Sequence, residues 1–66
     1  MSEITFWANV ERIANEKDIS WNEISRRSGI SRQNLTMNKR CLTEPRLSTI
    51  VKIAKSLETT SDSLIF

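Results

Sequence analysis

The sequence predicts an all-α fold on three observations. Apolar residues recur at helical spacing near both ends of the chain, and no segment shows the strict alternation of a half-buried strand. In the middle, two helix-start signals enclose one helix-stop signal. A chain of 66 residues has room for one small core, so we treat residues 1–66 as a single domain.

The first helix is expected from about Ile4 to Lys17. Its apolar residues fall on one stripe at helical spacing, as expected of a helix with one face in the core. The residues of this stripe are Phe6, Trp7, Val10, Ile13 and Ala14.

The first of two central helices has signals at both of its ends. Ser20 followed three residues later by Glu23 is a capping box, in which each side chain bonds the free backbone N–H of the other residue. Gly29 supplies the left-handed residue that ends a helix at low cost. These signals predict a helix over 21–28.

A second central helix follows directly after the glycine. Ser31 repeats the cap, and the helix is expected over 32–40. Because so few residues separate the two helices, the turn between them must be tight. Together they form a helix-turn-helix unit over about 20–40.

The rest of the chain predicts a loop and two further helices. Residues 42–45 form the loop, since the residue before Pro45 is pushed out of the helical region. A fourth helix begins at about Leu47, and Thr60 can cap a last short turn. The last turn holds Leu64, Ile65 and Phe66. The fourth helix has a broad apolar face, expected to be buried between its neighbours, made of Leu47, Ile50, Val51, Ile53, Ala54 and Leu57.

Composition excludes several classes of protein. The chain has no histidine and no visible pairing of a nucleophile with a base, so we expect neither an enzyme nor a metal or cofactor site. The single cysteine, Cys41, rules out an intramolecular disulfide and is expected to be a partly buried small apolar residue. No apolar run approaches the roughly 18 residues of a membrane span, and no signal peptide is visible, so the expected location is cytoplasmic.

Basic residues gather in the middle of the chain. Residues 1–23 hold two basic and five acidic residues, a net charge of −3, whereas residues 24–46 hold six basic residues and one glutamate, a net charge of +5. This pattern indicates a localised anion-binding surface, with nucleic acid as the first candidate partner. The alternative is a solvated helix face without a partner.

One face of the predicted helix over 32–40 is polar and basic. At about 100° per residue, Leu35 and Leu42 fall together on the side expected to face the core. The opposite side carries Gln33, Thr36, Met37 and Arg40, with Arg32 at its edge. Arginine and glutamine can make paired hydrogen bonds to guanine and adenine in the major groove, and the apolar parts of threonine and methionine can contact a thymine methyl group.

A set of small, apolar and capping residues recurs along the chain at fixed spacing. Its members are Val10, Ile13, Ile19, Ser20, Ile24, Ser25, Gly29, Ile30, Ser31, Leu35, Pro45, Leu47, Ile50, Ile53, Ala54, Leu57, Asp62 and Leu64. In this set the chain resembles the phage-repressor and Cro (Xre-type) family of helix-turn-helix DNA-binding domains over nearly its whole length. Each position is weakly informative alone, and the spacing of all of them is fairly specific.

The resemblance implies a compact five-helix bundle, a lambda-repressor-like domain, whose third helix, 31–40, enters the major groove of double-stranded DNA. The base-reading residues would be Ser31, Arg32, Gln33, Thr36 and Met37. The residues at the DNA backbone or minor groove would be Ser20, Trp21, Asn34, Lys39, Arg40 and Arg46. Trp21 stands where the family usually has glutamine, and its indole can either donate to a phosphate or pack against the protein.

The chain departs from the family pattern at four further places. The usual buried pair of arginine and glutamate is replaced by Ala14 and Lys39, and losing both partners together can be nearly neutral for stability. Cys41 replaces the usual glycine after the third helix, and Asn38 replaces an apolar or aromatic residue. Arg46 occupies the serine-like N-cap of the fourth helix, so that cap must come from elsewhere.

The implied function is a sequence-specific transcriptional repressor from a phage, a mobile element or a bacterial chromosome, which acts by occupying its site. Related domains usually bind inverted half-sites as homodimers, and the apolar end over 64–66 either forms a dimer face or packs onto the first helix. The alternative is a helical protein-interaction module, antitoxin-like or an adaptor, whose basic face binds an acidic partner. RNA binding is a weaker alternative, because few aromatic residues are available for stacking. We expect no membrane partner.

Overall fold

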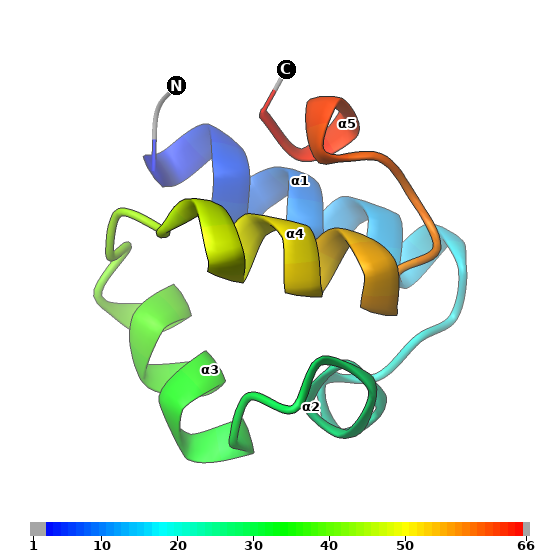
Figure 1. The fold of residues 1–66 in the computed structure, drawn as a ribbon, viewed down its shortest axis with the longest axis horizontal. Coiled ribbons are helices and arrows are strands. Elements are labelled where there is room, and N and C mark those ends of the chain that lie inside the picture. The colour runs from blue at the N-terminus through cyan, green and yellow to red at the C-terminus, as the bar shows by residue number, and fades with distance from the viewer. Residues whose placement is uncertain (1–2, 66) are drawn as a thin grey trace.

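The computed structural model describes residues 3–65 and folds them into five α-helices (Figure 1). The helices are α1 (Glu3–Glu16), α2 (Trp21–Ser28), α3 (Arg32–Arg40), α4 (Leu47–Ser56) and α5 (Ser61–Ile65). No strand occurs within this range. The predicted all-α fold with five helices is confirmed, and α1 lies one residue earlier in the chain than expected.

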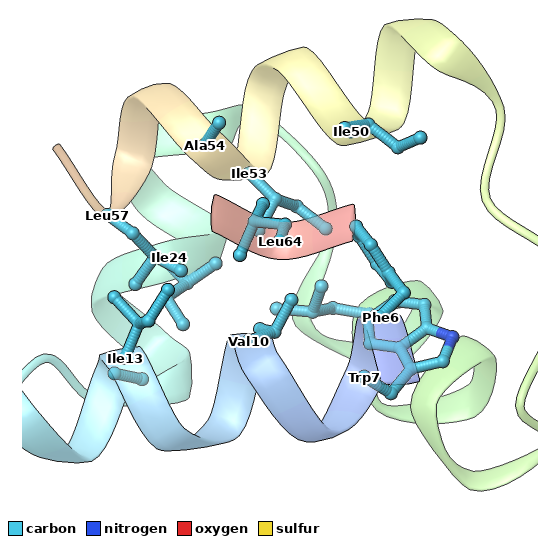
Figure 2. Packing of buried hydrophobic residues seen from close by; sticks show 12 residues of the cluster. Phe6, Trp7, Val10, Ile13, Ile24, Ile50, Ile53, Ala54, Leu57 and Leu64 are labelled. Atoms are coloured by element: carbon cyan, nitrogen blue, oxygen red, sulfur yellow. The ribbon is translucent and has the colours of Figure 1, made fainter. Parts of the chain in front are cut away.

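The core is built from all five helices, with α1 and α4 contributing most of it. Figure 2 shows side chains of α1, α2, α4 and α5 pointing toward one another. The predicted stripe of α1 is buried along its whole length, which confirms the helix and its inner face. The buried apolar residues are Phe6, Trp7, Val10, Ile13, Ala14, Ile24, Leu35, Ile50, Ile53, Ala54, Leu57 and Leu64.

The first turn of α4 does not join this core. Leu47 is 74% exposed, so the expectation that it is buried is wrong. Side chains of a helix tilt toward its N-terminus, and the side chain of a first-turn residue therefore projects past the end of the packed region. The buried face of α4 begins at Ile50 instead.

The turn between α2 and α3 has the predicted start and stop signals. Ser20 Oγ accepts a hydrogen bond from the backbone N–H of Glu23 (3.2 Å), and Gly29 ends α2 in the left-handed conformation (φ 76°). Ser31 Oγ accepts from the backbone N–H of Asn34 (3.1 Å) and so starts α3. These bonds satisfy helix-end N–H groups that have no partner within their own helix.

The second half of the predicted capping box is not formed. The Glu23 carboxylate turns away from the backbone of Ser20 and accepts hydrogen bonds from Arg26 and Arg27 on its own helix. These bonds hold the pKa of Glu23 below its ordinary value and raise the pKa of Arg26. Arg27 also donates to the backbone carbonyl of Ser56 (3.1 Å), which fixes the end of α2 to the end of α4.

Three helices end on a residue other than glycine in the left-handed conformation. Asp18, Leu42 and Glu58 have φ values of 56°, 51° and 55°, and backbone bonds of the Schellman type surround each of them. After α3, Cys41 stays right-handed (φ −87°) and Leu42 takes the left-handed position. The left-handed residue after α3 is thus Leu42, which directly follows Cys41, the position at which the family pattern has glycine.

This turn corrects two expectations about side chains. Cys41 is exposed rather than partly buried, and Leu42 is 42% exposed rather than packed inward beside Leu35. The reason is that α3 ends at Arg40, so the helical periodicity that aligned the two leucines stops before it reaches the second one.

The C-terminal helix packs onto α1. Thr60 Oγ1 accepts from the backbone N–H of Ser63 (3.3 Å), which confirms the predicted cap. Leu64 is fully buried and Ile65 is partly buried against the core, so these two residues follow the packing alternative rather than forming a free dimer face. Phe66 lies outside the described residues.

Candidate nucleic-acid interface

The outer face of α3 carries a continuous strip of exposed side chains. Arg32, Gln33, Thr36, Met37 and Arg40 line one shallow hollow, and we call these five residues the reading strip. Met37 is 54% exposed, whereas Leu35 on the opposite side of the helix is fully buried. The structure therefore brings together the five residues that the helical periodicity placed on one face. In Figure 1, α3 lies at the edge of the molecule, on the far side of α4 from α5.

The two arginines of the reading strip have no partner within residues 3–65. Neither Arg32 nor Arg40 makes a side-chain hydrogen bond or an ion pair there, and the same holds for Arg46. The other basic residues of the central segment are occupied: Arg26 and Arg27 by Glu23, and Lys39 by Glu11. The net charge of this segment is +5, but only three of its guanidinium groups are free to bind an anion.

Ser31 and Asn34 lie at the N-terminal end of the reading strip. The Ser31 hydroxyl oxygen is occupied as the cap of α3, and its hydrogen can still be donated outward. Asn34 uses its backbone N–H in that cap, and its exposed side chain makes no hydrogen bond within the described chain. No acidic residue lies in the first turn of α3, so the positive end of its helix dipole is unopposed.

Trp21 and Lys39 form a crevice beside the strip, lined also by Arg32 and Thr36. The Lys39 ammonium lies 5.4 Å from the centre of the Trp21 ring and 3.5 Å from a carboxylate oxygen of Glu11. The indole ring packs against the core, which is one of the two roles expected for Trp21. Its N–H has no acceptor within the described chain and is not buried, so contact with a phosphate stays a prediction.

The pair between Lys39 and Glu11 joins α3 to α1 where the family pattern has a different pair. Ala14, which stands at the family's arginine position, is buried against the core. The ammonium of Lys39 instead finds a carboxylate three residues earlier on α1. Both side chains of the pair are partly exposed (34% and 53%), so it stabilises the fold by at most about 1 kcal/mol. Sequence reasoning missed this pair, because no spacing rule links the two helices.

Ser20 and Arg46 lie at the starts of α2 and α4. Ser20 Oγ caps α2 and is exposed. Arg46 is the N-cap residue of α4 by its backbone (φ −75°, ψ 157°), and its side chain makes no capping bond. The guanidinium lines a hollow with half-buried Asn38 and the loop residues Thr43 and Glu44. The structure thus leaves this side chain free to reach a ligand.

Residues 3–65 contain neither a metal-binding cluster nor a membrane-spanning helix. No group of three or more carboxylate and thiol side chains in this range is arranged to hold a metal ion. Among the described helices, none is both long and apolar enough to cross a membrane.

Comparison with known proteins identifies the fold and its partner. Residues 9–65 match the Cro/C1-type helix-turn-helix DNA-binding domain. No functionally characterised protein and no solved structure gave a significant match. The matched range includes α2 and α3 and thus the whole reading strip. The chain therefore belongs to the Cro/C1-type family of helix-turn-helix domains, which bind double-stranded DNA and regulate transcription.

Proposed function

We propose that this protein is a sequence-specific repressor that reads the major groove with the reading strip of α3. The observation that carries this proposal is the strip itself, in which unpaired Arg32 and Arg40 flank an exposed amide and two apolar surfaces. The major groove admits an α-helix, and arginine and glutamine discriminate guanine and adenine through paired hydrogen bonds.

Each proposed contact follows from the position of its side chain. Ser31, Arg32 and Gln33 start the helix and, with Thr36 and Met37 one turn later, reach base edges. Asn34 at the start of α3 and Arg40 at its end meet the phosphates on either side of the groove. Ser20, Trp21 and Arg46, at the starts of α2 and α4, hold the DNA backbone. Lys39 lies near the same backbone but stays paired with Glu11, so it adds little to binding until that carboxylate is removed.

Occupancy is the proposed mechanism of repression. A domain seated in the groove over a promoter excludes polymerase and competing regulators without any chemical step. Two copies on an inverted repeat, with half-sites about one helical turn apart, would fill two successive major grooves on one side of the duplex. The proposed setting is the cytoplasm, where the DNA of a bacterium or phage is accessible.

Selection from a random duplex library at near-physiological salt tests the proposal. Wild-type protein should enrich a defined half-site. Arg32→Ala and Gln33→Ala should each relax the preference at a specific base and cost roughly 1–3 kcal/mol in binding. If both variants keep the wild-type preference and affinity, α3 is not the reading helix. If the wild-type protein enriches nothing, the free arginines are better explained by an acidic protein partner.

A further inference from the structure

Met37 is the one large apolar side chain of the reading strip. It is 54% exposed in the middle of α3, although the same helix buries Leu35 completely. Its neighbours on the helix surface are polar, since Gln33 lies four residues before it and Arg40 three residues after it. Met37 is thus surrounded by the groups proposed to meet DNA and packs against none of the core described above.

The major groove offers such a side chain one kind of apolar partner. The base edges there carry hydrogen-bond donors and acceptors, and the exception is the methyl group on C5 of thymine. Cytosine carries only a hydrogen atom at the same position. Methionine is unbranched and polarisable, so it adapts its shape to a small apolar group. With α3 in the groove, Met37 therefore separates pyrimidines that carry a C5 methyl group from those that do not.

The residue one turn before Met37 accepts either of two methylated pyrimidines. Thymine and 5-methylcytosine share the C5 methyl group and differ at C4, where thymine has a carbonyl acceptor and cytosine an amino donor. A carboxylate would select the amino group, but α3 contains no acidic residue. The Gln33 amide can donate to the carbonyl or accept from the amino group. The methyl group is then the feature that this part of the strip recognises.

From these observations we propose that the reading strip recognises the C5 methyl group of a pyrimidine and binds 5-methylcytosine as well as thymine. The inference rests on the proposed function, because Met37 meets a base only when α3 lies in the major groove. Burial of one methyl group changes affinity about fourfold. Methylation of a cytosine at this position of the operator strengthens binding by the same factor.

A duplex with one half-site, taken from the library selection, tests the proposal by fluorescence anisotropy. Each thymine is replaced in turn by deoxyuridine, which removes only the C5 methyl group. At one position at least, the wild-type protein should lose about fourfold in affinity. At that position, a pair of 5-methylcytosine with guanine should bind about fourfold more tightly than a pair of cytosine with guanine.

Variants of Met37 assign the effect to this side chain. Met37→Ala should abolish both differences in affinity, and Met37→Leu, which keeps an apolar side chain of similar size, should retain them. Because Met37 is exposed, neither change removes packing from the core. Leu47→Ala is the matched control, since it shortens an exposed apolar side chain outside the strip and should leave both differences unchanged.

The outcomes separate methyl recognition from DNA reading. Methyl recognition would be overturned, with the DNA-reading function intact, if no deoxyuridine weakened binding to the enriched half-site or if methylated and unmethylated cytosine bound equally. Methyl effects that persist in Met37→Ala would also overturn it, because they would arise from Thr36 or from the shape of the DNA. Absence of any enriched half-site would overturn both proposals.

Discussion

Glu11→Gln should increase the affinity for DNA and make it more sensitive to salt. The carboxylate of Glu11 lies 3.5 Å from the Lys39 ammonium, which borders the same crevice as Trp21 and Arg32. Removing the negative charge frees Lys39 for a phosphate. Each neutralised phosphate contributes about 0.9 to the slope of log affinity against log salt. Over a fourfold rise in salt, from roughly 50 to 200 mM, the variant should lose about 3.5-fold more affinity than wild type.

The assay is fluorescence anisotropy with a duplex too short for two copies, titrated at several salt concentrations. Glu16→Gln is the matched control, because it removes a carboxylate from the exposed pair with Arg12 on the same helix and changes the net charge equally. Lys39→Gln should leave the wild-type slope nearly unchanged and cancel the gain in the Glu11→Gln background. Equal slopes for the two glutamate variants, or a full loss of 0.9 from Lys39→Gln alone, would refute the reasoning.

Three further expectations concern stability. Glu58→Gly should raise the free energy of unfolding by about 1 kcal/mol and the melting temperature by about 4–8 °C, because glycine relieves the left-handed strain at φ 55°. The control Glu58→Ala keeps that strain. An equal gain in stability from alanine would contradict the role of strain. Leu35→Ala should cost about 2–5 kcal/mol in urea unfolding, since this side chain is fully buried, and a cost below about 1 kcal/mol would show that α3 is not anchored there. Glu23 has a pKa below its ordinary 4.5, so its contribution to stability is complete above that value and declines as the pH falls through the lowered pKa. Glu23→Gln should flatten the pH dependence of unfolding in that range, which acid titrations of the two proteins can compare.

Local sequence signals predicted the helices well because each end has a chemical cause close by. Ser20, Gly29 and Ser31 act within a few residues, and so do the stripe of α1 and the polar face of α3. These signals depend on backbone geometry and helical period, which are readable in one dimension. They also placed the reading strip correctly on one exposed face.

The errors all arose where a helix ends or where two distant segments meet. Periodicity assigned Leu42 and Leu47 to the core, although one follows the end of α3 and the other projects from the first turn of α4. The pairing of Glu11 with Lys39 depends on the packing of α1 near α3, which no local pattern encodes. A rule of spacing within one helix could have found the bond from Arg27 to Glu23 but not its second bond to Ser56.

The distribution of partners among the basic residues bears directly on specificity. Acidic residues of α1 and α2 occupy Lys39, Arg26 and Arg27, so the three guanidinium groups free within the described chain, Arg32, Arg40 and Arg46, are those proposed to face DNA. Few free charges limit the electrostatic affinity that applies to every sequence, since that term grows with the number of phosphates neutralised. Discrimination would then rest on the base contacts proposed for the reading strip, which favour an operator over random sequence. A protein with all ten basic residues free would bind more tightly everywhere and select less.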